Sequence, residues 1–244
     1  MKFIAKHYKA ACLLSFPLFL AACGSDDVRE VIVEVPVEVE VPAEVPEPVD
    51  VSYQVTVTNL TNGQPVSPPA VVLHTNGYLW ELGGVASVEL ERIAEVGDSA
   101  NFLTLGDASA GGDGPILPGE QQTISVTIAD TTDAKLTIAA MLGNTNDAFT
   151  GISAWDLSQL EVGEGYTTVA GAYDSGTEAN TETAESVPGP AAGGEGFNPT
   201  RDDTGFISMH PGVVSVDDGL STSVLTSQEK FDNPVVRIHI MRTE

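Results

Sequence analysis

Hydrophobic and polar residues alternate along several segments of the chain, and a period of two predicts β-strands. In the last such segment, aliphatic residues occupy every second position, and arginine, histidine and methionine lie between them. Turns rich in Gly, Asn and Asp separate the segments. The pattern predicts an all-β fold, an antiparallel β-sandwich. The clearest strands are expected at Val51–Leu60, Gln122–Asp130, Ala134–Leu142 and Asn233–Arg242.

One segment has a helical period instead. Gly84–Asp98 carries apolar residues along one side, and Gly97 is suited to end a helix. Strands and helices do not alternate regularly, so a doubly wound parallel sheet is not expected. Two long segments, Gly106–Glu120 and Glu185–Gly205, have no clear period. Loops of this length in a compact domain are either functional or mobile.

The beginning of the chain has the pattern of a targeting segment. Three lysines precede the apolar run Ala10–Leu20, which is shorter than the roughly 20 residues that a membrane-spanning helix needs. The sequence LAAC at Leu20–Cys23 resembles a bacterial lipobox. This resemblance implies that residues 1–22 are a signal peptide and that Cys23 is lipidated, and Gly24 after it favours the outer membrane. An ordinary signal peptide with an incidental cysteine is the alternative.

After Cys23 comes a segment of Val, Glu and Pro, which extends to Asp50. Proline blocks a helix and the glutamates repel one another, so residues 23–50 are predicted to form an extended tether. An edge strand or a partner-binding segment is the alternative, because alternating valines also suit a strand. Residues 51–244 show no second change of composition and are predicted to form one domain. That domain has no cysteine, which excludes disulfides and cysteine catalysis.

The formal net charge is −25, from 35 acidic and 10 basic residues. Nucleic acids and anionic lipid surfaces both attract basic proteins, so neither is an expected partner. Cation binding is compatible with this charge. One stretch, Gly171–Glu182 (GAYDSGTEANTE), places Asp174, Glu178 and Glu182 four residues apart among turn-forming residues. These acids either bind a cation or are ordinary turn residues.

Three segments, in this order, resemble the spondin N-terminal domain family of F-spondin and mindin type. They are Met141–Leu157 (MLGNTNDAFTGISAWDL), Ala172–Glu182 (AYDSGTEANTE) and the closing Asn233–Arg242 (NPVVRIHIMR). Upstream, His74–Asp98 is similar to bacterial members. The resemblance covers nearly all of residues 51–244. It implies a C2-like β-sandwich that binds calcium in loops at one end.

The resemblance assigns calcium-binding positions to Asp147, Asp174 and Glu178. Calcium takes about six to eight oxygen ligands, and carboxylates commonly supply several of them. Glu178 stands where the family has Asp, and a glutamate can still bind the ion. Glu182 has no counterpart in the family and is expected to be a solvated acid. The pairs Asp202–Asp203 and Asp217–Asp218 could complete this site or form another, but turns are the preferred interpretation.

Patterns typical of enzymes are weak. His74, His210 and His239 lack the close spacing of zinc ligands and are expected to be structural. The GxSxG pattern of α/β-hydrolases is missing, and acids are too numerous here to indicate a glycosidase. Trp80 and Trp155 could form a platform for sugars or peptides, but Trp155 fits a strand better. The sequence therefore predicts a protein without catalytic activity.

Together these features predict a lipid-anchored envelope protein that presents a calcium-binding domain for adhesion. Its ligand would be a matrix protein, another protein or a polysaccharide, and its membrane contact would be the anchor at Cys23. The alternatives are an envelope hydrolase that acts on polysaccharide or peptide, and a lipoprotein with a purely structural role.

Overall fold

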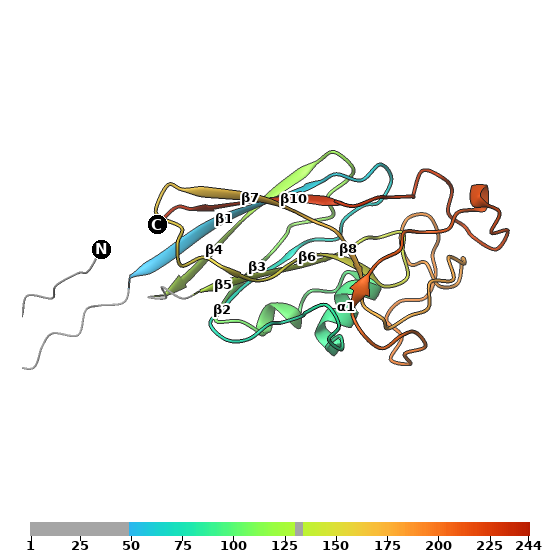
Figure 1. Cartoon of the computed structure of the whole chain (residues 1–244), viewed down its shortest axis with the longest axis horizontal. Coiled ribbons are helices and arrows are strands. Elements are labelled where there is room, and N and C mark those ends of the chain that lie inside the picture. Colours follow the sequence, from blue (N-terminus) through green and yellow to red (C-terminus); the bar gives the residue numbers. More distant parts are fainter. Residues whose placement is uncertain (1–48, 130–133) are drawn as a thin grey trace, which may run out of the picture. The chain divides into compact units, whose positions relative to one another are not determined.

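The computed structural model describes residues 49–129 and 134–244 (Figure 1). Cys23, the predicted signal peptide and nearly all of the predicted tether lie outside these residues. Residues Pro48–Glu244 form one compact unit. No helix within the described ranges is long and apolar enough to cross a bilayer.

Two antiparallel sheets confirm the predicted all-β sandwich (Figure 1). The strands predicted from the alternating pattern are β1, β4, β5 and β10, each within a few residues of its expected bounds. The four-stranded sheet has the order β4 (Gln121–Ala129), β1 (Asp50–Asn59), β10 (Val236–Arg242) and β7 (Gly165–Ala170). The six-stranded sheet has the order β3 (Ala108–Gly111), β2 (Ala70–His74), β5 (Lys135–Met141), β6 (Ala148–Asp156), β8 (Ala172–Asp174) and β9 (Ser208–Met209).

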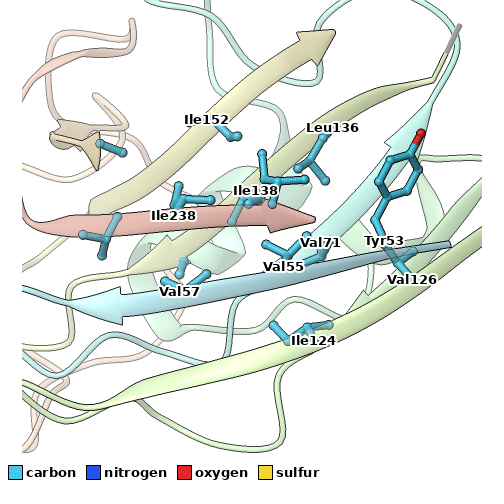
Figure 2. Packing of buried hydrophobic residues seen from close by; sticks show 14 of the residues in the cluster. Tyr53, Val55, Val57, Val71, Ile124, Val126, Leu136, Ile138, Ile152 and Ile238 are labelled. Atoms are coloured by element: carbon cyan, nitrogen blue, oxygen red, sulfur yellow. The ribbon is translucent and has the colours of Figure 1, made fainter. Parts of the chain in front are cut away.

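The main hydrophobic core lies between the two sheets (Figure 2). Every second residue of β1 and β10 is buried in it, including Val55, Val57 and Ile238. From the other sheet, Leu136 and Ile138 of β5 enter the same core. The period of two in the sequence therefore corresponds to one face of each strand in the core and one face outward.

A second core covers the outer face of the six-stranded sheet. Helix α1 (Val88–Val96) packs there, and its Leu90 and Ile93 contact a cluster that includes Phe102 and Phe149. Since both faces of β5 are covered, all but the first of its residues are buried. This second layer explains why β5 does not alternate as cleanly as β1.

Local capping fixes the ends of α1. The hydroxyl of Ser87 accepts a hydrogen bond from the Leu90 N–H at 3.2 Å, so the helix begins later than the predicted Gly84. Gly97 adopts the left-handed conformation with φ 68° and ends the helix, as predicted. Two short 3₁₀ helices complete the elements, η1 at Phe102–Thr104 and η2 at Val216–Asp218.

Truncation of the main core tests this packing. Ile138 is 1% exposed and lies between the sheets, so Ile138→Ala should lower the free energy of unfolding by about 2–5 kcal/mol. Ile138→Val removes one methylene group and should cost about 0.5–1.5 kcal/mol. Urea unfolding would measure both values. Equal small losses for the two variants would contradict a tightly packed core at this position.

Candidate metal centre

Three carboxylates come together at one end of the sandwich. Asp147 directly precedes β6, Asp174 ends β8, and Asp203 lies in the long loop between β8 and β9. One carboxylate oxygen from each lies within 4.8 Å of the others. The structure thus brings together two of the three residues predicted as calcium ligands and adds Asp203, which had been assigned to a turn.

Strand pairing places the first two acids side by side. β6 and β8 are antiparallel neighbours, with Ala148 opposite Asp174. The loop that carries Asp203 then binds along the turn that follows β8. In this contact the Asp202 N–H donates to the Thr177 carbonyl at 3.1 Å, and the Gly205 N–H donates to the Gly176 carbonyl at 2.9 Å.

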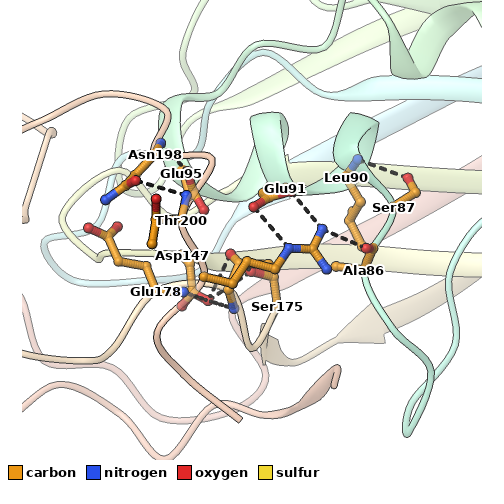
Figure 3. A network of polar contacts seen from close by, with 12 residues as sticks. Ala86, Ser87, Leu90, Glu91, Glu95, Asp147, Ser175, Glu178, Asn198 and Thr200 are labelled. Atoms are coloured by element: carbon orange, nitrogen blue, oxygen red, sulfur yellow. Dashed lines mark hydrogen bonds and ion pairs between the residues drawn. The ribbon is translucent and has the colours of Figure 1, made fainter. Parts of the chain in front are cut away.

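The two oxygens of Asp147 have different surroundings (Figure 3). Oδ2 accepts hydrogen bonds from the Ser175 hydroxyl at 2.8 Å, the Thr177 N–H at 2.9 Å and the Glu178 N–H at 3.1 Å. Oδ1 is buried and has no hydrogen-bond partner. A buried carboxylate oxygen without a donor is costly, so Oδ1 is the oxygen that a cation would satisfy.

A chain of side chains holds Asp174. Its Oδ1 accepts from the Gly176 N–H at 2.8 Å, and its Oδ2 accepts from the Asn180 amide at 2.6 Å. The Gly212 N–H donates to Nδ1 of His210, so the proton of that ring lies on Nε2 and is donated to Asn180 Oδ1 at 3.2 Å. The network fixes the position of the carboxylate. It leaves further lone pairs on both oxygens, because each accepts one bond.

Glycine is required at the turn between these acids. Gly176 has φ 71°, and a Cβ there would lie 2.4 Å from the Phe206 carbonyl oxygen. A larger residue would therefore push the loop that carries Asp203 away from Asp174. This close approach gives the Gly in the sequence YDSGTE a structural reason beyond turn formation.

Glu178 does not belong to the cluster of three carboxylates. Its backbone N–H binds Asp147, while Figure 3 shows its side chain extending away from Ser175. Burial, together with the nearby carboxylates of Glu95 and Glu195, raises the pKa of Glu178 from 4.5 to about 8. The structure thus gives Glu178 a position beside the cluster, with its main chain as the link to Asp147.

Helix α1 holds the loop that carries Asp203 (Figure 3). The guanidinium of Arg201 donates to both oxygens of Glu91, at 3.0 and 2.6 Å, and to the carbonyl of Ala86. One turn further on, Glu95 accepts a hydrogen bond from the Asn198 N–H at 2.9 Å. These bonds connect residues more than 100 positions apart, so no local pattern could have predicted them.

Repulsion between the carboxylates favours a bound cation. Burial and the neighbouring Asp174 raise the pKa of Asp147 to about 6. The same two causes raise the pKa of Asp203. All three candidate ligand atoms are carboxylate oxygens. Hard divalent cations prefer oxygen ligands to the nitrogen of histidine and the sulfur of cysteine. The triad of Asp147, Asp174 and Asp203 could therefore bind a metal ion.

The remaining acids of the sequence analysis lie elsewhere. Asp217 and Asp218 are part of η2, where Lys230 forms an ion pair with Asp218 at 2.7 Å. The expectation that Glu182 is solvated is wrong, because Glu182 is 2% exposed. Its Oε1 accepts from the Val214 N–H at 3.2 Å, and burial raises its pKa. Its main-chain carbonyl accepts from the Val224 N–H at 2.9 Å, so both contacts come from residues more than 30 positions away, and the local sequence gives no sign of them.

The raised pKa of Glu178 predicts a pH dependence of stability in metal-free protein. The unfolded chain ionises at its ordinary pKa of 4.5, whereas the folded protein keeps the proton up to about pH 8. Stability is therefore lost as pH rises between these values, since the folded state binds more protons. Glu178→Gln should reduce this loss and be more stable than the wild type at pH 8. Urea unfolding in chelator at pH 5 and pH 8 measures the difference, and an unchanged pH dependence would contradict it.

Comparison of the chain with protein-family models gives no match, and comparison with curated proteins gives none either. The resemblance to spondin N-terminal domains therefore rests on the segments quoted from the sequence. The structure itself shows a β-sandwich with an acidic triad at one end.

Proposed function

We propose that the chain is a cell-envelope lipoprotein whose spondin-like domain binds calcium at Asp147, Asp174 and Asp203 and serves in adhesion. The observation that carries this proposal is the cluster of three carboxylates, one of which, Asp147, has a buried oxygen without a hydrogen-bond partner. The ligand of the adhesive loops would be a matrix protein or an envelope or matrix polymer. The lipid anchor at Cys23 would attach the domain to the outer membrane.

Calcium suits these ligands better than other biological cations. It accepts about six to eight oxygens in irregular geometry, which separate loops can provide. The side chain of Asn146, next to Asp147, is fully buried and neither its oxygen nor its nitrogen has a hydrogen-bond partner. Its amide oxygen is a further candidate ligand. Main-chain carbonyls and water would supply the rest of the coordination shell.

The bound ion would act as a cross-link between three segments. It would join the turn before β6, the end of β8 and the loop between β8 and β9, of which the last has no regular secondary structure. Neutralising three carboxylates would remove their repulsion and order that loop. The ordered loops would then form the adhesive surface at this end of the sandwich.

Calcium should stabilise the protein through the triad. Added to chelator-treated protein, calcium should raise the melting temperature once its concentration exceeds the dissociation constant, because only the folded state holds the site. Asp203→Asn should remove at least most of this rise. Asp113→Asn makes the same charge change at an exposed position outside the triad and should respond like the wild type.

Two results would contradict the calcium site. One is an unchanged melting temperature at millimolar calcium, and the other is an equal response of Asp203→Asn and Asp113→Asn. The adhesive role requires in addition that calcium-loaded protein binds immobilised matrix polymer or matrix protein and that Asp203→Asn binds less.

The lipid anchor has its own test. Cys23→Ser removes the sulfur that would carry the lipid, so the protein should lose incorporation of labelled fatty acid and leave the membrane fraction. Cys12→Ser changes the other cysteine of the chain and serves as the control. Incorporation of label into Cys23→Ser would rule out this anchor.

A further inference from the structure

The outward face of the four-stranded sheet carries a polar hollow of about 340 Å³. Successive side chains of a strand point to opposite faces of the sheet. In each of the four strands, the residues that alternate with the buried ones therefore lie on this outward face. The hollow is lined by Thr56, Thr58, Gln121, Thr167, Arg237 and His239. It belongs to the other sheet of the sandwich from the acidic triad.

This sheet is almost free of acidic residues, although the chain has 35 of them. Its four strands contain one carboxylate, Asp50, at the start of β1. Arg237 lies opposite Thr58, eight positions further along β1. Eight residues correspond to about 26 Å at roughly 3.3 Å per residue. No carboxylate lines the hollow itself, which makes it neutral to basic, although Glu120 directly precedes Gln121 and the Glu244 carboxylate accepts a hydrogen bond from Ser52 of β1.

Three of the six basic residues in the described ranges, Arg237 among them, form no ion pair with an acidic side chain. Arg92, Arg201 and Lys230 each form an ion pair with an acidic side chain. The guanidinium of Arg237 donates to the Thr58 hydroxyl at 3.3 Å and has no ion pair within residues 49–129 and 134–244. An exposed guanidinium without a carboxylate partner can bind an external anion through two parallel hydrogen bonds.

Next to Arg237, His239 is held in a fixed place. Its Nδ1 is 2.9 Å from the Thr167 hydroxyl. The ring also lies against Gly165, where a Cβ would come within 2.8 Å of the imidazole. Glycine thus leaves room for the imidazole beside the hollow. With the hydroxyls of Thr56 and Thr167 and the amide of Gln121, the hollow offers both donors and acceptors around one cationic group.

We propose that this hollow binds an acidic polysaccharide through a uronate carboxylate on Arg237. The hydroxyl and amide groups around the guanidinium would pair with the hydroxyls of the same and adjoining sugars. The hollow lies over β10, whose main chain is already hydrogen-bonded to β1 and β7, so a peptide strand cannot add to the sheet there. An open face on which only side chains are available suits a polymer of hydroxylated, charged rings.

The inference supplies a ligand class for the proposed polymer binding and does not use the calcium site. Binding is therefore measured with full-length protein in chelator, so that failure of the calcium proposal does not affect the result. The probe is an oligogalacturonate, and its fully methyl-esterified form is the uncharged counterpart. Salt of about 0.15 M limits the range of charge effects to about 8 Å, which weakens repulsion by distant acids.

Arg237→Gln keeps a long polar side chain and removes the charge, so the dissociation constant for oligogalacturonate should rise at least about tenfold. Lys135→Gln is the matched control, because it changes the net charge equally but lies on β5 in the other sheet. It should bind like the wild type. The methyl ester should bind the wild type as weakly as the free acid binds Arg237→Gln.

Three outcomes would overturn the inference. They are equal affinity for acid and ester, equal affinity of Arg237→Gln and Lys135→Gln, and equal or tighter binding of a polyglutamate peptide of the same charge. Urea unfolding of Arg237→Gln shows whether the fold is intact. His239→Ala gives a second variant on the same face, and a normal affinity in both variants would also overturn the proposed site.

Discussion

The buried carboxylate of Asp147 organises the end of the sandwich where the long loops meet. Its Oδ2 accepts hydrogen bonds within the turn after β8, from the Ser175 hydroxyl and from the N–H groups of Thr177 and Glu178. A turn rich in glycine, serine and threonine has little tendency of its own to hold one conformation. The carboxylate supplies the acceptor that these groups require. Its other oxygen has no donor, and the same carboxylate lies beside Asp174 and Asp203, so the residue that shapes the turn is also part of the candidate metal centre.

The second support for this end comes from α1. Val187 and Ile207 anchor the long loop between β8 and β9 in hydrophobic clusters, and polar contacts with α1 hold the segment near Asp203. Glu91 is 2% exposed and would be costly as an isolated charge, but Arg201 neutralises it with two hydrogen bonds. Removal of either partner would leave a buried or unsatisfied group and loosen the segment that carries Asp203. The helix thus affects the metal centre although it contributes no ligand.

The sequence allowed more of the fold than of the site to be predicted. Strands such as β1 and β10 bury one face in the main core, and so their alternation is visible in the residues alone. The prediction of Asp147 and Asp174 used short segments that become neighbours through the pairing of β6 with β8. Asp203 joins the cluster and Glu178 lies outside it, because loop contacts over more than 20 residues decide which carboxylate lies near Asp147. Glu182 shows the same limit, since only the folded loops reveal that it is buried.

Charge is distributed unequally between the two sheets, and this matters for both proposals. A net charge of −25 repels other polyanions, so an acidic polymer could approach only where the surface lacks carboxylates. The hollow on the outer face of the four-stranded sheet is lined by no carboxylate, and the six-stranded sheet ends in the acidic triad. Cations and anionic sugars would then bind to different sheets, each in surroundings of suitable charge. Such a separation would let the domain bind a cation that orders the loops and an anionic sugar at the same time, because the two ligands would use different residues.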